Sequence, residues 1–258
     1  MPKPSYRVGK RNARQRAINA LAARHTVLRL NMAVIPNAAC ILADKLPKNA
    51  PVRDQSADLT ALAGSLQGIS FLDVSAALSA HTDEQLYYRT DHHWTTMGAQ
   101  AAYTLWAQAT GHTARSYDLT LATDSFRGTL YSKVLLPDHA AYDTVELYVP
   151  QTDVEYYVSY GDAAETSATI YDRSALDQKD KYTVFFGGNY PRVDVYTTAE
   201  TGKTLLLFKD SYANCLMQFL YPYYDHIILI DPRYYYDNVE SVISREQVTD
   251  VLFLYNAN

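Results

Sequence analysis

Cysteine is scarce in this chain. Cys40 and Cys215 are the only two among 258 residues, and two cysteines cannot form a disulfide framework. They also cannot supply all four ligands of a structural zinc site. The cysteine content therefore excludes a disulfide-stapled fold, and it leaves the cellular compartment open.

Long apolar runs are missing as well. No run approaches the roughly 20 apolar residues that span a bilayer. The N-terminal segment, residues 1–25, is basic and lacks the apolar core of a signal peptide. We therefore expect no membrane span in this chain.

An excess of basic charge is also absent, because the net charge is -5 at pH 7. Proteins that bind nucleic acid usually present a clustered basic surface. The one basic cluster, Lys3 to Arg16, is short and is more typical of a solvated helix face. We therefore expect no nucleic-acid partner.

The chain has ample apolar residues for a core. Hydrophobic residues make up 48% of the sequence, which argues against disorder and suits one large domain or one domain with a substantial insertion. Hydrophobic periodicity predicts alternating helices and strands in the first part of the chain. The expected elements are a basic amphipathic helix over residues 10–24, a strand over 27–35, a helix over 55–66, a short strand over 69–72 and a helix over 96–106 capped by Thr95.

The same alternation returns from Thr204 to the end of the chain. We expect strands over residues 205–208, 227–230 and 251–255, with helices from about residue 212 and over 238–244. These strands are continuous apolar runs, as is typical of strands buried on both faces of a parallel sheet. The expected fold class is therefore α/β, with a central, mainly parallel sheet flanked by helices.

The middle of the chain has a different character. It contains short β-favouring segments separated by turns, over residues 145–149, 154–158, 182–186 and 193–196. We interpret residues 112–201 as a β-rich insertion. Residues 1–111 and 202–258 would then be the first and second parts of the α/β domain.

Ser211 follows an expected strand after only Lys209 and Asp210. Ligands bind where loops leave the carboxyl ends of strands in open α/β sheets. A serine at this position, at the start of a helix, can act as a nucleophile whose oxyanion is stabilised by backbone N–H groups. The alternative is that Ser211 only caps the helix.

A second polar segment, Asp91-His92-His93-Trp94, precedes the helix that follows Thr95. Alternate residues of an extended segment share one side, so Asp91 and His93 can pair and leave Nε2 of His93 free to act as a base. One alternative is a capping Asp with two surface histidines. Another is a zinc site, which would need further ligands from His81, Asp83, His112, His139 or a cysteine.

The string YYRTDHHWTTMGAQAAY resembles the motif of the DHHW protein family, whose members are similar to SGNH-type hydrolases and to the O-acetylation proteins of bacterial alginate. The resemblance extends from about residue 25 over nearly the whole chain and implies an SGNH-like three-layer fold. The other matching segments are LNMAVIPNAACILADKLP, FRGTLYSKV, FFGGNYP, LLLFKDSYANCLMQFLYPYYDHIILIDPRYY and TDVLFLYN.

The resemblance implies a Ser-His-Asp triad. Ser211 matches the nucleophile, His93 the base and Asp91 the group that orients the base, whereas His92 matches a variable position. SGNH hydrolases often complete the oxyanion hole with a Gly and an Asn from other loops. Asn189 and Asn214 are the candidates here, beside the backbone N–H groups of Ser211 and Tyr212.

We therefore predict a serine-dependent O-acetyltransferase or acetylesterase that acts on an extracellular or cell-wall polysaccharide without a cofactor or metal. Arg89 and Arg233 are candidates for binding an acidic sugar, and salt bridges are an equal alternative for both. The expected partners are the polysaccharide and an acyl donor, with a membrane-bound acyl-transfer protein as a further candidate. Most relatives carry an N-terminal membrane anchor, so the resemblance implies the bacterial cell envelope, outside the cytoplasm, and a longer parent chain.

Two other function classes stay open. One is a carbohydrate-binding or scaffold protein that keeps the fold without turnover, and the other is a metal-dependent hydrolase that uses His92 and His93. The triad hypothesis makes a geometric prediction, namely that Ser211 Oγ, His93 Nε2 and the Asp91 carboxylate form a chain near hydrogen-bond length. We also expect Trp94 to pack into the domain and fix its loop.

Overall fold

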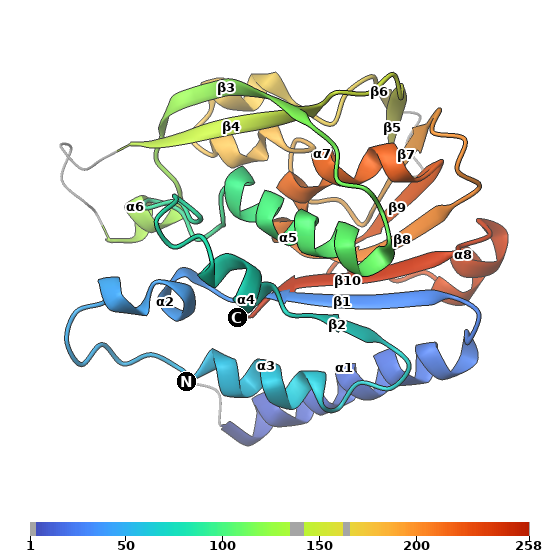
Figure 1. Ribbon diagram of the computed structural model, residues 1–258, viewed down its shortest axis with the longest axis horizontal. Coiled ribbons are helices and arrows are strands. Elements are labelled where there is room, and N and C mark those ends of the chain that lie inside the picture. The colour runs from blue at the N-terminus through green and yellow to red at the C-terminus, as the bar shows by residue number, and fades with distance from the viewer. Residues whose placement is uncertain (1–3, 135–141, 162–165, 258) are drawn as a thin grey trace.

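A computed structural model describes residues 4–134, 142–161 and 166–257 of the chain (Figure 1). Within these residues, eight strands form a central sheet in the order β2-β1-β10-β8-β9-β7-β5-β6. The first five strands in this order are mutually parallel, and the last three run antiparallel to their neighbours. Their bounds are β1 Arg29–Ile35, β2 Ser70–Leu72, β5 Tyr156–Tyr160, β6 Thr166–Ser167, β7 Arg192–Thr197, β8 Thr204–Lys209, β9 His226–Ile230 and β10 Asp250–Asn256.

Side chains alternate between two apolar cores, one on each face of the sheet. In β1, Met32 packs into one core and Ala33 into the other, and in β8 the same holds for Leu206 and Leu207. This alternation is the period of two that a strand imposes. Because both faces are buried, the strands appear in the sequence as unbroken apolar runs, and the mainly parallel sheet flanked by helices is confirmed.

Helices cover both faces of the sheet. Helices α1 (Pro4–Arg24), α3 (Gln55–Ala63) and α8 (Val239–Arg245) bury Leu21, Leu59 and Val242 against one face. The opposite face carries α4, α5 and α7, which lie on the side of β1 and β10 away from α1 and α3 in Figure 1. The remaining bounds are α2 Ala38–Ile41, η1 Ala43–Lys45, α4 Val74–Ser79, α5 Thr96–Thr110, α6 Thr129–Val134, η2 Arg173–Asp177, η3 Lys181–Val184, η4 Ser211–Leu216, α7 Met217–Leu220 and η5 Tyr221–Tyr223.

A separate antiparallel hairpin lies over the helices of the upper layer (Figure 1). It consists of β3 (Tyr117–Phe126) and β4 (Asp143–Pro150). Val145 and Leu147 of β4 are buried in the same core as α5 and α7. The hairpin is therefore anchored to the layer of helices that also carries the candidate site.

The middle of the chain contributes to the central sheet as well as to the hairpin. Strand β7 pairs with β9 in antiparallel fashion, and β5 and β6 extend the sheet beyond it. Sequence patterns of single strands do not reveal this, because strand partners lie far apart in the chain. The boundaries at residues 111/112 and 201/202 stay a prediction.

The expected strand over residues 182–186 is wrong. This segment contains the 3-10 helix η3, and Tyr182, Val184, Phe185 and Phe186 are all at most 3% exposed. A strand with one face on a core would expose alternate residues, whereas this segment turns back on itself inside the core. Phe186 has a φ of 68°, which ends any extended conformation directly before Gly187.

Candidate active site

Ser211 lies just past the carboxyl end of β8, an inner strand of the parallel part of the sheet. Strand β8 ends at Lys209, and Ser211 is the first residue of η4. Asp210 caps this helix, since its Oδ1 accepts from the backbone N–H of Tyr212 at 2.9 Å. Asp210 Oδ2 also accepts from the backbone and side chain of Asn256, the last residue of β10. The sharp turn that presents Ser211 is thus tied to the neighbouring strand.

The acid, the base and the serine form a continuous chain of contacts. His93 Nε2 is 2.8 Å from Ser211 Oγ, and His93 Nδ1 is 2.6 Å from Asp91 Oδ1. Both Asp91 and His93 are buried. The predicted geometry is confirmed, and it has the pattern in which a carboxylate orients an imidazole toward a hydroxyl.

Thr129 holds the outer oxygen of Asp91. Its backbone N–H and its hydroxyl both donate to Asp91 Oδ2, at 2.7 Å and 2.9 Å. The preceding residue is glycine for a steric reason, because a Cβ on Gly128 would lie 2.3 Å from the Asp91 side chain. The start of α6 therefore fits directly against the acid.

A second buried carboxylate, Asp143 at the start of β4, supports the same loop. It accepts from the backbone N–H groups of Arg89 and Thr90 at 2.9 Å and 2.7 Å, and from the Thr90 hydroxyl at 2.6 Å. Thr90 Oγ1 in turn accepts from the N–H of Gly128 at 3.1 Å. The hairpin, α6 and the Asp91 loop are thereby locked together.

The environment of Asp91 favours its charged form. Burial acts to raise the pKa of the carboxyl, but hydrogen bonds from His92, His93 and Thr129 and the charge on His93 outweigh it, so the pKa lies far below its usual range. For His93, burial lowers the pKa below 6.5, and this outweighs the opposing effect of Asp91. At neutral pH the pair is therefore a carboxylate beside a neutral imidazole. In this state Nε2 of His93 can accept a proton.

Trp94 packs into the domain as expected. It is fully buried, and its Nε1 donates to the backbone carbonyl of Tyr212 at 2.9 Å. In return, the Tyr212 hydroxyl donates to the backbone carbonyl of His92. The base and the nucleophile are thus joined through the two residues that follow them.

Tyr182 is a site residue that the sequence analysis missed. Its ring stacks on the imidazole of His93, with centroids 3.8 Å apart and an interplanar angle of 10°. Its hydroxyl donates to the backbone carbonyl of Ser211 at 2.9 Å. Tyr182 therefore contacts both reacting residues, and the expected strand over its segment carried no signal of this.

Lys209 was also missed as a site residue. It is 2% exposed, and its Nζ donates to Oδ1 of Asn214 at 2.7 Å and of Asn189 at 3.2 Å. Burial lowers its pKa to about 8. The available signal was a lysine at the end of an apolar strand, because such a lysine must find acceptors inside the protein.

The oxyanion candidates differ in their hydrogen bonds. The N–H of Tyr212 already donates to Asp210. Both ends of the Asn214 amide are engaged, because Nδ2 donates to the carbonyl of Gly188 at 3.4 Å and Oδ1 accepts from Lys209. Asn189 is exposed and is oriented by Lys209 through its carbonyl oxygen.

The two arginines differ in their environment. The side chain of Arg89 is exposed on the loop before Asp91. Arg233 forms a bidentate pair with Asp231, just past β9, with Nε 2.9 Å from Oδ1. The salt-bridge alternative therefore describes Arg233, and a sugar contact for Arg89 stays a prediction.

Asp91, His92 and His93 also satisfy the spacing of a metal site, since one ligand atom from each lies within 4.8 Å of the others. Both ring nitrogens of His93 are engaged, however, by Asp91 and Ser211. His81 contacts Glu84, and His112 stacks on Trp106. His139 lies outside the described residues. Within the described residues, no larger group of metal-ligating side chains includes His81, Asp83, His112 or a cysteine.

Comparison with known families identifies the chain. The family model of the SGNH hydrolase-like domain of the acetyltransferase AlgX matches residues 9–175. The chain belongs to this family. The match includes Asp91 and His93 and ends before Ser211. No curated protein matches the sequence significantly.

Solved structures confirm the SGNH-like fold and the DHHW resemblance. A DHHW family protein from Eubacterium siraeum is 27% identical, with a TM-score of 0.78 over 90% of this chain and 78% of that one. Bacillus cereus PatB1 is 21% identical, with a TM-score of 0.80 over 94% and 88%. The O-acetyltransferase domain of Pseudomonas putida AlgJ is 15% identical, with a TM-score of 0.55 over 94% and 79%.

Among the described residues, no helix combines the length and the apolar character needed to cross a bilayer.

Proposed function

We propose that this protein is a serine-dependent O-acyltransferase or esterase in which Ser211 is the nucleophile, His93 the general base and Asp91 the residue that orients His93. The observation that carries the proposal is the chain of contacts from Asp91 Oδ1 to His93 to Ser211 Oγ, at 2.6 Å and 2.8 Å. Membership in the family of the acetyltransferase AlgX supports the same chemistry.

In the first half of the reaction, Ser211 Oγ attacks the carbonyl carbon of an acyl ester while its proton passes to His93 Nε2. The tetrahedral intermediate collapses to the acyl-serine, and the leaving alcohol takes the proton from His93. In the second half, His93 removes a proton from an acceptor hydroxyl or from water, which attacks the acyl-serine. Ser211 regains its proton when the product ester or acid leaves.

The oxyanion needs donors that are not already in use. We infer that these are the N–H of Ser211 and the Nδ2 of Asn189. Lys209 binds the carbonyl oxygen of Asn189 and so directs Nδ2 of this exposed amide away from the lysine. The N–H of Tyr212 would serve only if Asp210 released it.

We further propose that the acyl group is acetyl and that the acceptor is a polysaccharide outside the bacterial cytoplasm, in the cell envelope. AlgX is named as an acetyltransferase and the AlgJ domain as an O-acetyltransferase. The acyl donor would be a second partner, delivered by a membrane-bound acyl-transfer protein.

The kinetic test uses hydrolysis of p-nitrophenyl acetate by the purified chain. Ser211→Ala and His93→Ala should each lower the rate by at least about a thousandfold, and the double variant should be little worse, because triad members act as a unit. Adding polysaccharide fragments should divert acetyl onto sugar hydroxyls if the protein is a transferase. A wild-type protein with no turnover that still binds glycans would indicate a binding or scaffold protein instead.

A further inference from the structure

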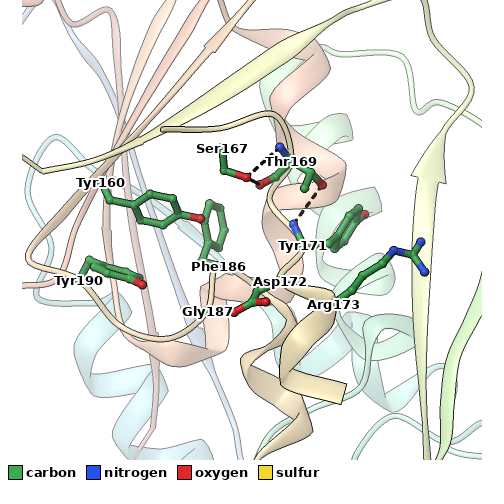
Figure 2. Close-up of a pocket in the computed structure, with 9 residues that line it drawn as sticks. All are labelled: Tyr160, Ser167, Thr169, Tyr171, Asp172, Arg173, Phe186, Gly187 and Tyr190. Carbon is green, nitrogen blue, oxygen red and sulfur yellow. Dashed lines mark hydrogen bonds between the residues drawn. The ribbon is translucent and has the colours of Figure 1, made fainter. Parts of the chain in front are cut away.

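A concave site lies outside the triad (Figure 2). Its volume is about 290 Å³, close to the lower limit of about 300 Å³ for small-molecule pockets. None of its lining residues belongs to the triad. The pocket is lined by Tyr160, Ser167, Thr169, Tyr171, Asp172, Arg173, Phe186, Gly187 and Tyr190.

Tyrosine side chains contribute to the wall beside polar groups. Tyr160 and Tyr190 are half-buried, and their ring centroids lie 4.7 Å apart at an angle of 51°. Phe186 lies beside Tyr160 in the view of Figure 2. Rings with one apolar face and a hydroxyl at the edge suit a ligand that has apolar C–H faces and polar edges. A sugar ring has this character.

Asp172 supplies a fixed hydrogen-bond acceptor. Its Oδ1 is held by the N–H and hydroxyl of Ser174, at 3.0 Å and 2.5 Å. Its Oδ2 is directed toward Gly187, because a Cβ built on that glycine would lie 3.3 Å from it. In Figure 2 the side chain of Arg173 extends away from Asp172, Tyr160 and Tyr190 and lies beside Tyr171. A carboxylate oxygen at this place can accept hydrogen bonds from the hydroxyl groups of a ligand, and it repels a second carboxylate.

The absence of a side chain at Gly187 keeps the pocket open. A Cβ there would also lie 3.4 Å from the hydroxyl of Tyr190. Gly187 has a φ of 71°, and its neighbours Phe186 and Gly188 have φ values of 68° and 144°. Three successive residues with positive φ, one of them a phenylalanine, mark a strained turn of the type that clusters at ligand sites.

The same turn also contacts two residues near the nucleophile, Lys209 and Asn214. The carbonyl of Gly188 accepts from Nδ2 of Asn214 at 3.4 Å, and Oδ1 of Asn189 accepts from Lys209 at 3.2 Å. Lys209 and Asn214 flank Ser211 in the sequence. A ligand in the pocket would therefore be separated from the nucleophile's loop by the single turn Phe186–Tyr190.

We propose that this pocket is a glycan subsite that binds one neutral pyranose unit of the acceptor, through Tyr160, Tyr190 and Asp172. The proposal rests on the proposed function, because it assumes that the acceptor is a polysaccharide. It adds the class of sugar, namely a neutral sugar in this subsite in place of a uronic acid.

Direct binding tests the proposal without requiring turnover. Cellotetraose and chitotetraose are the neutral probes, and tetragalacturonate is the acidic probe, each titrated by calorimetry into wild-type protein and into Ser211→Ala. At least one neutral probe should bind both proteins with equal affinity and more tightly than tetragalacturonate. Tighter binding of tetragalacturonate, or no binding of either neutral probe, would overturn the proposal. If the wild-type protein binds the neutral probe but has no esterase or transferase activity, only the proposed function is refuted and the subsite proposal stands.

Variants locate the binding. Tyr160→Ala and Tyr190→Ala should each weaken binding of the neutral probe at least fivefold. The matched control is Tyr157→Ala, because Tyr157 is on the same strand as Tyr160, is 49% exposed and is not part of the pocket. It should change the affinity less than twofold. Thermal unfolding checks that each variant is folded, and Tyr190→Phe, which keeps the ring, should retain most of the affinity. Equal affinities for wild type, Tyr160→Ala and Tyr190→Ala would place the binding elsewhere and overturn the proposal.

Discussion

Each side of the His93 ring has its own neighbour. Asp91 contacts Nδ1, Ser211 contacts Nε2, and Tyr182 stacks on one face. The ring of His92 lies with its centroid 3.9 Å from that of His93. Burial lowers the pKa of His93, Asp91 raises it, and the charge of His92 lowers it further. The state of the base is therefore set by residues that do not react themselves.

The pH dependence follows from these contacts. Because His93 must be neutral to accept a proton and its pKa is below 6.5, the acid limb of p-nitrophenyl acetate hydrolysis should have its midpoint below pH 6.5. His92→Gln removes a positive charge beside His93, so the midpoint should move to higher pH. A pH–rate profile of both proteins measures this. A wild-type midpoint above pH 6.5 would contradict the assignment of His93 as the base, and a midpoint that is unchanged or lower in His92→Gln would contradict the effect of His92 on His93.

The segment that carries the acid and base has no regular secondary structure of its own. It depends on other elements, through Asp143 of β4, Thr129 of α6 and the Tyr212 carbonyl in η4. Trp94 also holds the segment in place, because its large side chain is fully buried in the core. Removing one of these contacts should therefore loosen the loop that carries Asp91 and His93.

Trp94→Ala should therefore reduce the free energy of unfolding by about 3 to 5 kcal/mol, from the lost packing of a fully buried aromatic side chain. Chemical denaturation of wild type and variant measures the difference. Trp94→Phe keeps most of the ring and loses the hydrogen bond to Tyr212, so it should cost less. A change within about 0.5 kcal/mol for Trp94→Ala would contradict the packing described here.

Sequence patterns predicted elements well where they depend on local signals. Thr95 caps α5 through a hydrogen bond from Gly98, as its position before an alanine-rich helix indicated. The strand predicted over residues 182–186 was wrong, because a run of apolar and aromatic residues is typical of a strand and equally of a tight turn buried in a core. The contact of Lys209 with Asn189 joins residues 20 positions apart in different elements, so local patterns could not provide it.

At the scale of the whole molecule, the sheet order explains why two distant motifs meet. Strand β8 lies between β10 and β9, and Ser211 follows its carboxyl end. Asp91 and His93 come from the loop before α5. Beyond β9, the antiparallel strands β7 and β5 extend the sheet, and Tyr160 at the end of β5 lines the glycan pocket. Apolar runs predicted the parallel strands, but the antiparallel extension needed long-range pairing that no local pattern encodes.

The central claim is that Ser211 is an activated nucleophile. PatB1 has been solved with a sulfonyl adduct, and a sulfonyl fluoride is suited to this test because its adduct does not turn over. After incubation with phenylmethanesulfonyl fluoride, peptide mass spectrometry should find one sulfonyl group, on Ser211 of the wild-type chain. The adduct should be absent from Ser211→Ala and form far more slowly in His93→Ala. A wild-type Ser211 that stays unmodified, or that reacts equally fast without His93, would contradict the account.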